Sequence, residues 1–345
     1  MIQVAVVGAG HWGPNLIGNF ESSARSTVRY VVDQDVDRLA AIQSRFSSVQ
    51  AVTDLGPVVD DPEVDALVIA TPTATHFEIA RLALEKGKHV LVEKPLTHSV
   101  ESSRALCELA EQRGLVLMVG HVFLYNAAAR RVKTYIDEDE LGRIFYISMS
   151  RTNLGPIRTD VDAAWDLAAH DVSLASSWLG AWPSQVSASG GAFINPGIAD
   201  VIFATLRYPG GVLVNLHASC LNPRKSREIT VVGDKKMLIF DDVNLEAPIA
   251  VHDKQVEGAG GPISDPPVVD SFSSFRTSVH FGEITQPSVE SSEPLKNECE
   301  HFLECVSSGD RPLSDGRAGL GVVRVLDAIS VSMRENGREV PVEIE

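Results

Sequence analysis

The sequence predicts an α/β protein of two domains, in which a doubly wound parallel sheet is followed by a domain with a large, mainly antiparallel open sheet. In the first part of the chain, short apolar runs alternate with amphipathic helical patterns. In the second part, strand patterns follow one another across short turns. The chain has 345 residues, enough for two cores of ordinary size, and we place the domains at 1–123 and 124–345.

Five short runs in the first domain are rich in Val, Ile and Leu, as in strands that a parallel sheet buries on both faces. They lie at 4–7, 28–32, 66–70, 89–92 and 115–119. Amphipathic helical patterns separate them, at 35–46, 75–86 and 99–113. This alternation favours right-handed crossovers, with helices on both faces of the sheet.

The second domain begins with a helical pattern, a long strand and another helical pattern, at 126–137, 144–153 and 166–179. Four strand patterns follow, at 200–208, 212–220, 227–232 and 236–240. Pro209-Gly210-Gly211 and Gly233-Asp234 have the composition of hairpin turns, so these strands are expected to run antiparallel. The polar segment 253–293 is expected to form long loops, and helices at 295–307 and 315–334 end the chain.

The charge balance and the apolar pattern exclude several classes of partner. Asp and Glu number 46 against 30 Lys and Arg, so a nucleic-acid partner is not expected, although a local basic pocket for a small anion stays open. No apolar run could span a bilayer, and a strand pattern begins at residue 2 without a basic leader, which predicts a cytoplasmic protein with no membrane partner. The four cysteines have no ligand spacing, so no metal site is expected.

The first strand ends in Gly8-Ala9-Gly10-His11-Trp12-Gly13, a complete G-x-G-x-x-G that also begins a helix. The first glycine permits the tight turn, the second lets the backbone approach a pyrophosphate, and the third lets helix and strand pack closely. N–H groups at the start of the helix can donate to the phosphates. Asp33 ends the second strand, twenty positions after Gly13, where a carboxylate accepts from ribose hydroxyls. The sequence therefore predicts a dinucleotide-binding Rossmann domain.

Asp33 also bears on which dinucleotide binds. Its carboxylate repels a 2′-phosphate and accepts a hydrogen bond from a free 2′-hydroxyl, which favours NAD over NADP. Arg38 lies one helical turn further along and would offset part of that repulsion. NAD is the predicted cofactor, and use of NADP stays open.

Three further motifs follow the opening glycines in order. Thr71-Pro72-Thr73-Ala74-Thr75-His76 and Glu93-Lys94-Pro95 come after successive strands, and Trp165-Asp166-Leu167-Ala168-Ala169-His170 lies in the second domain. Together these motifs resemble the Gfo/Idh/MocA oxidoreductases over nearly the whole chain. The resemblance implies a Rossmann domain and a substrate-binding α/β domain, whose open sheet joins subunits into a homodimer or homotetramer.

Oxidation of a secondary alcohol would give Lys94, Asp166 and His170 a role. Oxidation removes a hydride from carbon and a proton from oxygen, and histidine suits the proton acceptor because its pKa lies near neutrality. Asp166 and His170 are four residues apart on one helix face, a spacing that an incidental pair would share. Lys94 follows a strand end, where it could bind the reacting oxygen or be an ordinary solvated lysine. The resemblance implies that Lys94 and His170 are catalytic and that Asp166 orients His170 or binds the substrate.

Other residues are candidates for contact with cofactor or substrate. On the cofactor side, the candidates are His11, Trp12, Thr71, Pro72, His76, Glu93, Lys94 and Asn126. His121 and Tyr125 follow the last Rossmann strand and are expected to face the nicotinamide or the sugar. The candidates on the substrate side are Arg151, Asn153, Arg224 and Lys225, of which the basic ones could meet a phosphate or be ordinary surface charges.

Three local stretches resemble a branch of the family that acts on nucleotide-linked amino sugars and includes UDP-N-acetylglucosamine 3-dehydrogenases. They are the residues 10–16, 151–155 and 293–299. The resulting hypothesis is an NAD-dependent dehydrogenase that oxidises a hydroxyl, at C3, of a nucleotide-activated hexose to a ketone. An inositol or glucose dehydrogenase, a 3-ketosugar reductase and a non-catalytic dinucleotide-binding regulator are the alternatives. The joint presence of Lys94, Asp166 and His170 favours an enzyme over a regulator.

Overall fold

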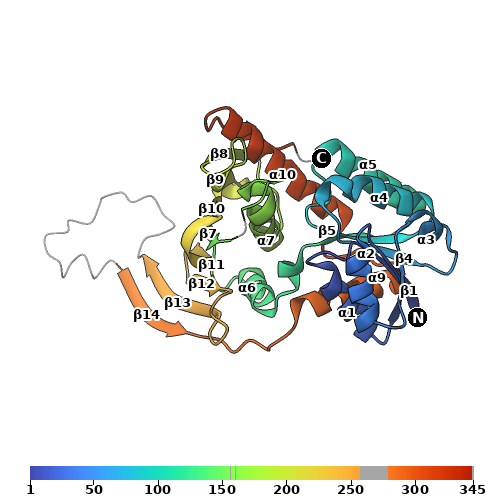
Figure 1. The fold of residues 1–345 in the computed structure, drawn as a ribbon. Coiled ribbons are helices and arrows are strands. Elements are labelled where there is room, and N and C mark those ends of the chain that lie inside the picture. The colour runs from blue at the N-terminus through green and yellow to red at the C-terminus, as the bar shows by residue number, and fades with distance from the viewer. Residues whose placement is uncertain (156, 160, 257–278, 344–345) are drawn as a thin grey trace, which may run out of the picture. The chain divides into compact units, whose positions relative to one another are not determined.

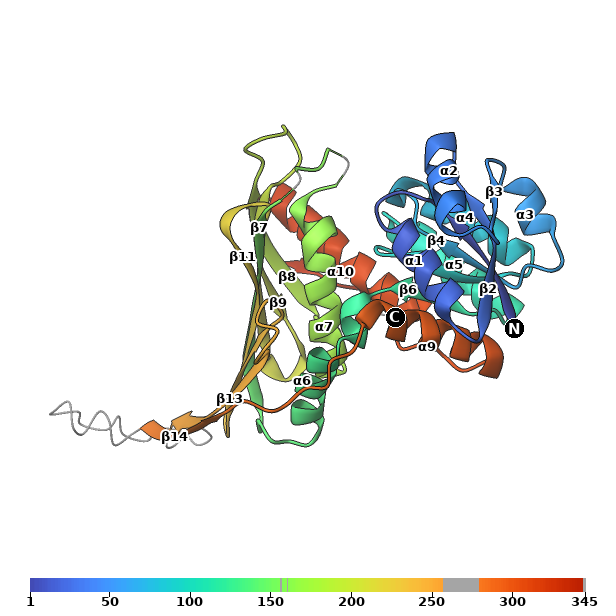
Figure 2. The ribbon, with the colours of Figure 1, turned by 60° about the horizontal axis from the view of Figure 1, so that its bottom comes forward.

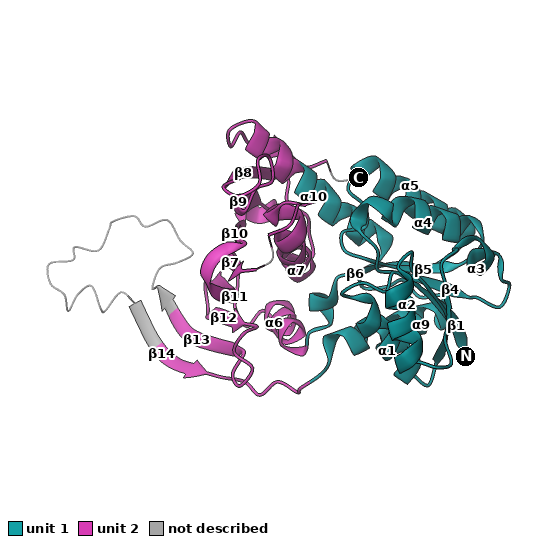
Figure 3. Cartoon of the chain, in the orientation of Figure 1, with its two compact units in different colours: residues 1–126, 292–327 teal, residues 127–291, 328–345 magenta. Residues whose placement is uncertain are grey.

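The computed structural model describes residues 1–155, 157–159, 161–256 and 279–343, and in them the chain forms two compact units (Figure 3). Unit 1 comprises residues 1–126 and 292–327, and unit 2 comprises residues 127–291 and 328–345. Each unit is built on its own sheet (Figure 1). Among the described residues, no helix combines the length and the apolar character that crossing a membrane requires.

Unit 1 contains a six-stranded sheet with strand order β3-β2-β1-β4-β5-β6, in which every neighbouring pair is parallel. The strands are β1 (Ile2–Val7), β2 (Ser26–Val32), β3 (Gln50–Val52), β4 (Ala66–Ile69), β5 (His89–Glu93) and β6 (Leu117–Gly120). The connecting helices are α1 (Gly13–Ser22), α2 (Val36–Arg45), α3 (Gly56–Asp60), α4 (Thr73–Glu85) and α5 (Val100–Arg113). The predicted doubly wound parallel sheet is confirmed, although β3 and α3 are too short for the sequence pattern to show.

The C-terminal helices complete unit 1, which is where the structure departs from the expected division at 123/124. After η1 (Val122–Tyr125) the chain builds unit 2 and returns as α9 (Pro294–Ser308) and the first part of α10 (Gly316–Arg334), within which the unit boundary falls. Helix α9 packs on α1 and η1, and Phe302 lies edge-to-face on Phe20 with ring centroids 6.2 Å apart. The return depends on contacts between residues far apart in the chain, so a linear pattern does not reveal it.

Unit 2 contains a nine-stranded sheet with strand order β14-β13-β12-β11-β7-β10-β9-β8-β15. The strands are β7 (Ile144–Leu154), β8 (Gln185–Gly191), β9 (Val201–Arg207), β10 (Leu213–Ser219), β11 (Leu221–Gly233), β12 (Met237–Asp241), β13 (Ile249–Val256), β14 (Val279–Thr285) and β15 (Val340–Pro341). The short 3-10 helix η3 (Pro209–Gly211) joins β9 to β10, which pair antiparallel. Only the β7–β10 pair is parallel among the described pairings, so the predicted mainly antiparallel sheet is confirmed.

Three helical segments lie along one face of this sheet, together with the end of α10 that belongs to unit 2 (Figure 2). They are α6 (Ala127–Asp137), the π-helical turn η2 (Ala164–Ala168) and α7 (Ala169–Leu179). Trp178 joins the layers, because its ring packs edge-to-face on Phe240 and its indole Nε1 donates to the carbonyl oxygen of Ala129 at 3.0 Å. The core of unit 2 therefore lies between these helices and the sheet.

One secondary-structure prediction is wrong. The segment 253–293, expected to form loops, contains the end of β13 and the whole of β14, which pair antiparallel at the edge of the sheet. Strands β8 and β15 were also not predicted. An edge strand is stabilised by backbone hydrogen bonds to one neighbour and tolerates polar residues, so its composition resembles that of a loop. Residues 257–278 of that segment lie outside the described part of the chain.

The contact between Phe20 of α1 and Phe302 of the returning helix α9 allows a test of how much α9 contributes to the stability of unit 1. Both rings are fully buried, so Phe302→Ala should lower the free energy of unfolding by about 3–5 kcal/mol through lost burial and a residual cavity. Urea unfolding followed by circular dichroism measures the change. Phe193→Ala is the matched control, because Phe193 is 71% exposed and its loss should cost less than about 0.5 kcal/mol. Equal losses in the two variants would contradict the packing argument.

Candidate active site

The glycine loop after β1 is shaped by two close contacts and one open face. Gly8 has a φ of +102°, and a side chain there would lie 2.6 Å from the carbonyl oxygen of Ala70. A side chain at Gly13 would collide with the carbonyl oxygen of Gly8. At Gly10 the nearest atom to an added Cβ is the Nη1 atom of Arg38, at 3.6 Å. Two glycines are thus needed for packing, whereas Gly10 leaves backbone accessible, as a pyrophosphate requires.

Asp33 fixes the geometry of this loop. Its Oδ2 accepts a hydrogen bond from the Ala9 N–H at 2.6 Å, and its Oδ1 accepts from the Asp35 N–H at 2.9 Å. The Nη1 atom of Arg38 lies 3.8 Å from the same Oδ2, while the Arg38 side chain is also paired with Asp35. Asp33 and Arg38 therefore lie beside the open side of Gly10. His11 is exposed next to them.

The other sequence motifs of unit 1 gather at the same edge of the sheet. Strands β1, β4, β5 and β6 are adjacent and parallel, so the segments that follow them leave the sheet at its carboxyl edge. These segments carry Thr71, Lys94 and His121. Glu93 and Gly120 are paired in register at the ends of β5 and β6. In open α/β sheets this edge is where ligands bind.

The Glu93 carboxylate connects three of these segments. It accepts a hydrogen bond from the Trp12 indole of the glycine loop and one from the Lys94 N–H at 3.3 Å. A side chain at Gly120 would lie 3.1 Å from its Oε2, so the glycine gives it room. Burial raises the pKa of Glu93 to about 7, against the opposing effects of Lys94 and Trp12. Glu93, expected to contact the cofactor, is thus bonded to the glycine loop itself.

A second acid lies near Glu93 and was not identified from the sequence. Glu298 on α9 is fully buried, and both carboxylate oxygens lack a hydrogen-bond partner among the described residues. Burial raises its pKa well above the ordinary value, and the charge of Glu93 adds to that effect. The sequence pattern could have revealed this buried acid. Glu298 lies on the helix face that also carries the buried Leu295 and Phe302, so the helical periodicity places it in the core. We take Glu298 to be the protonated member of the pair, since hydrogen-bond donors reach only Glu93.

His121 and Tyr125 face the interior of unit 1. Tyr125 is buried, its hydroxyl lies 3.1 Å from the Ser314 hydroxyl, and its ring lies against His301. The expectation that Tyr125 faces the nicotinamide or sugar does not agree with this position. His121 is buried, and neither ring nitrogen has a hydrogen-bond partner in the described part of the chain. Burial lowers its pKa to about 3, assisted by Lys94. Asn126, next in the chain, is partly buried.

His76, expected to line the nicotinamide site, is instead enclosed between two loops. Its Nδ1 lies 2.9 Å from the carbonyl oxygen of Pro95, and its Nε2 lies 2.9 Å from the carbonyl oxygen of Thr71. Burial lowers the pKa of His76, and the two carbonyl groups act in the opposite direction. Pro72, by contrast, is exposed at the start of α4.

In unit 2 the motif with Asp166 and His170 spans a change of helix type. The predicted helix 166–179 begins earlier than expected, with the π-helical turn η2, and His170 is the second residue of α7. The Asp162 carboxylate accepts from the Ala164 and Trp165 N–H groups at 2.9 and 3.0 Å and so caps this turn. Asp166 is paired with Arg158, whose Nη1 lies 3.3 Å from Oδ1. A π turn changes side-chain directions, so it aims Asp166 differently from a continuous α-helix.

Arg151 is placed differently from the sequence expectation. Its Nε and Nη2 atoms donate to Asp171 Oδ1 at 2.9 and 2.7 Å, and both side chains are buried. The pair fastens the residue after His170 to the central strand β7. Arg151 therefore anchors α7 and is not presented to a substrate phosphate, because a buried guanidinium keeps its carboxylate partner.

The remaining substrate candidates lie near the ends of β7 and β11. Asn153 is partly buried, and Arg224 and Lys225 are exposed. The Thr152 hydroxyl donates to the carbonyl oxygen of Arg224 at 3.0 Å, which ties this end of β11 to β7. Arg158 and Asp171 were not singled out from the sequence, since nothing in the linear pattern shows their carboxylate or guanidinium partners.

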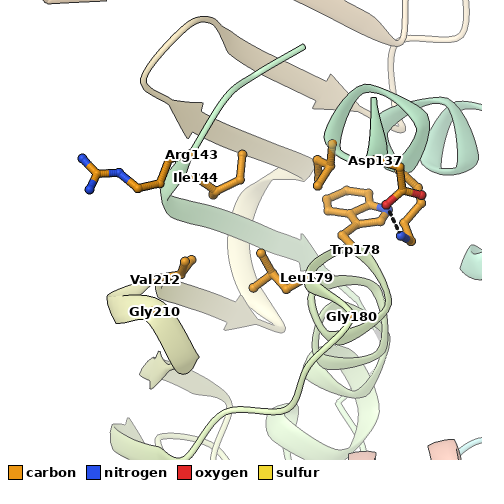
Figure 4. Close-up of a pocket in the computed structure, with 10 residues that line it drawn as sticks. Asp137, Arg143, Ile144, Trp178, Leu179, Gly180, Gly210 and Val212 are labelled. Carbon is orange, nitrogen blue, oxygen red and sulfur yellow. Dashed lines mark hydrogen bonds and ion pairs between the residues drawn. The ribbon is translucent and has the colours of Figure 1, made fainter. Parts of the chain in front are cut away.

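Unit 2 also has a hollow of about 420 Å³ at the far end of α7 from His170 (Figure 4). Ile136, Ile144, Leu179 and Val212 are among its lining residues. Its lining includes none of the residues predicted to bind cofactor or substrate. We assign it no part in the chemistry.

Comparisons with known proteins decide the family of this chain. Residues 2–121 match the Gfo/Idh/MocA oxidoreductase family with its NAD-binding Rossmann fold, and residues 129–239 match the Gfo/Idh/MocA C-terminal domain. The chain belongs to the Gfo/Idh/MocA family. It is thus an NAD-binding oxidoreductase, as the sequence predicted.

Individual relatives of this Gfo/Idh/MocA protein act on sugars and inositols. A UDP-N-acetylglucosamine 3-dehydrogenase of Acidithiobacillus ferrooxidans is 31% identical over 252 residues, covering 70% of this chain and 75% of the relative. A scyllo-inositol 2-dehydrogenase (NAD(+)) of Bacillus subtilis is 26% identical over 90% of this chain and 88% of its own. A solved structure of UDP-N-acetylglucosamine 3-dehydrogenase from Acidithiobacillus ferrooxidans superposes with a TM-score of 0.81 at 25% identity, covering 98% of this chain and 99% of the other.

The buried acid pair predicts a pH dependence of stability. A carboxyl group whose pKa is raised in the folded state stabilises the protein fully below its unfolded value of about 4.5, and that contribution is lost as the pH rises toward about 7. Glu298→Gln removes one of the two acids and keeps the shape of the side chain. The variant should therefore be more stable than the wild type at pH 8, by about 1 kcal/mol or more.

Thermal unfolding monitored by circular dichroism at pH 4, 6 and 8 measures this difference. The two proteins should be most alike at pH 4, where both carboxyl groups are protonated in either state. Glu300→Gln serves as the control, because Glu300 lies on the same helix and is partly exposed. A wild type that gains stability between pH 6 and 8 relative to Glu298→Gln would contradict the assignment.

Proposed function

We propose that this protein is an NAD-dependent dehydrogenase that oxidises a sugar hydroxyl to a ketone, the substrate being the C3 hydroxyl of a nucleotide-activated hexose such as UDP-N-acetylglucosamine. The observation that carries the proposal is the presence, in a Gfo/Idh/MocA chain, of Lys94 at the carboxyl edge of the parallel sheet and of Asp166 and His170 at a capped π-to-α junction. The similarity to a UDP-N-acetylglucosamine 3-dehydrogenase supports the choice of substrate.

The residues of unit 1 fit the cofactor. The open face of Gly10 gives the pyrophosphate backbone N–H groups, and the helix that starts at Gly13 favours the negative charge. Asp33 keeps an acidic group beside that face, which favours the free ribose hydroxyls of NAD over the phosphate of NADP. Arg38 beside Asp33 weakens this preference without reversing it. Bound NAD supplies the acceptor for the hydride.

In the proposed reaction, the carbinol carbon loses a hydride to the cofactor, the hydroxyl oxygen loses a proton to His170, and a carbonyl group forms. Asp166 orients the imidazole or holds the sugar, with Arg158 as its ion-pair partner. The Lys94 ammonium donates to the reacting oxygen and stabilises the alkoxide as negative charge develops. Arg224 and Lys225 are exposed and could meet the diphosphate of a nucleotide sugar.

A second candidate substrate class has its own support. The scyllo-inositol 2-dehydrogenase aligns over 90% of the chain, a longer stretch than the nucleotide-sugar enzyme. The same three residues could oxidise a free polyol, because the proton and hydride steps involve only the carbinol group. Unlike the nucleotide-sugar reaction, this one would not use the exposed cations on β11.

The substrate class is tested by NADH formation from a panel of UDP-sugars, free inositols and simple hexoses. UDP-N-acetylglucosamine should be turned over with a kcat/KM at least about 100-fold above the free sugars, since the diphosphate adds binding energy. Lys94→Ala and His170→Ala should bind NADH like the wild type and lose turnover by about 100-fold or more.

Arg45→Ala is the control variant, because Arg45 ends α2 and stacks on Phe46 away from the glycine loop. Turnover of the free polyols alone would replace the proposed substrate by the second candidate. Unchanged turnover in both Lys94→Ala and His170→Ala would overturn the catalytic assignment and leave a dinucleotide-binding protein.

We further propose that a second copy of the chain covers the open face of the unit 2 sheet. The helices lie on the other face (Figure 2). Tyr146, Phe203 and Leu213 are exposed large side chains on three adjacent strands, Leu213 opposite Tyr146 in register. Phe203 stacks on His217 with ring centroids 4.5 Å apart. A flat, partly apolar sheet face of this kind is typical of a self-complementary interface.

Light scattering after size exclusion tests this assembly. The wild type should form a dimer or tetramer, and Phe203→Asp should shift it toward the monomer, because a charge would be buried at the interface. Leu245→Asp is the control, since Leu245 is 89% exposed in the turn between β12 and β13 and should leave the mass unchanged. A monomeric wild type would overturn the proposal.

A further inference from the structure

His76 lies in the first turn of α4 and connects the two loops that follow β4 and β5. Its Nε2 is 2.9 Å from the carbonyl oxygen of Thr71, and its Nδ1 is 2.9 Å from the carbonyl oxygen of Pro95. Only 1% of the residue is exposed, so water does not compete for these contacts. Both ring nitrogens therefore face carbonyl oxygens of unit 1 and are not available to a ligand. A neutral imidazole carries one N–H, so it donates to one of these two carbonyl groups.

The two carbonyl groups that His76 contacts belong to different loops. Pro95 directly follows Lys94, and its carbonyl group is close in sequence to the ammonium that the proposed reaction uses. Thr71 follows β4, and its hydroxyl accepts a hydrogen bond from the Thr75 hydroxyl at 2.7 Å. A backbone carbonyl that is held by a buried donor cannot shift without losing a hydrogen bond in a site that water does not reach.

We propose that His76 is a positioning residue, whose Nδ1–H donates to the carbonyl oxygen of Pro95 and so fixes the Lys94 segment, while its Nε2 edge lies against the cofactor-side loop at Thr71. The inference rests on the proposed function, because it takes Lys94 to be catalytic. His76 itself touches neither substrate nor cofactor. It acts through the backbone, so a donor toward Pro95 should control kcat, and contact with Thr71 should control the KM for NAD.

Two conservative variants separate the nitrogens. The amide nitrogen of Asn occupies the position of Nδ1, so His76→Asn keeps a donor toward Pro95 and gives up the contact with Thr71. The amide nitrogen of Gln reaches the position of Nε2, so His76→Gln places its donor at Thr71 and loses the one toward Pro95. We expect His76→Gln to lower kcat by about 10-fold or more, because small displacements of a catalytic group are costly. His76→Asn should keep kcat within about 3-fold and raise the KM for NAD.

The matched control is His89→Asn. His89 begins β5, the strand that ends just before Lys94, and its Nδ1 accepts from the Val116 N–H at 3.0 Å, a bond that Asn can replace. This variant tests whether replacing any histidine near the Lys94 segment alters kcat. We expect His89→Asn to retain wild-type kcat and KM, whatever its effect on thermal stability.

The experiment measures kcat and KM for NAD in the four proteins, and amide hydrogen exchange of the peptides that contain Lys94 and Thr71. A kcat of His76→Gln at least about 5-fold below that of His76→Asn supports the proposal, as does faster exchange at Lys94 in His76→Gln alone. Equal kcat in the two variants, or exchange that rises equally in both peptides, would show a merely structural histidine and overturn it. Should the wild type turn over no sugar of the panel, the proposed function fails, and the exchange data decide the role of His76 separately.

Discussion

The arrangement of unit 1 depends on the parallel pairing of β1, β4, β5 and β6. Parallel strands end at one edge of the sheet, so the segments that follow them are forced together although they are far apart in the sequence. The glycine loop, Thr71, Lys94 and His121 all lie on such segments. The apolar interior of the strands provides the rigidity, and the edge carries the chemistry.

Buried and half-buried polar groups connect these segments to one another. The Asp33 carboxylate holds the glycine loop, the Glu93 carboxylate holds the Trp12 indole and the Lys94 N–H, and His76 lies between two carbonyl groups. Each such group costs desolvation energy, which hydrogen bonds offset only when the geometry is kept. The network therefore specifies one arrangement of the loops more than it adds stability. Glu298 lacks hydrogen-bond partners among the described residues, so the cost of burying it is not offset by this network.

Unit 2 positions its own candidate catalytic residues by different means. The buried Arg151–Asp171 pair anchors the start of α7 to β7, and the Asp162 carboxylate caps the π-helical turn before it. Asp166 and His170 then project from a junction that is fixed on both sides. A π-helical turn is less favourable than an α-helical one, so its presence here agrees with a functional constraint on the direction of Asp166.

The linear pattern of residues was enough to predict the alternation of strands and helices in unit 1, the mainly antiparallel character of the second sheet, the dinucleotide motif and the family. These features depend on local periodicity, turn chemistry and short motifs, which the linear order contains. Folding alone established the partners of Arg151, His76 and Glu93, the burial of Glu298, and the return of α9 and the first part of α10 to unit 1. It also formed the strands β13 and β14 in a segment of loop-like composition. These features arise from contacts between residues distant in the chain, and burial, which turns an ordinary Glu or His into a group with a shifted pKa, exists only once the chain has folded.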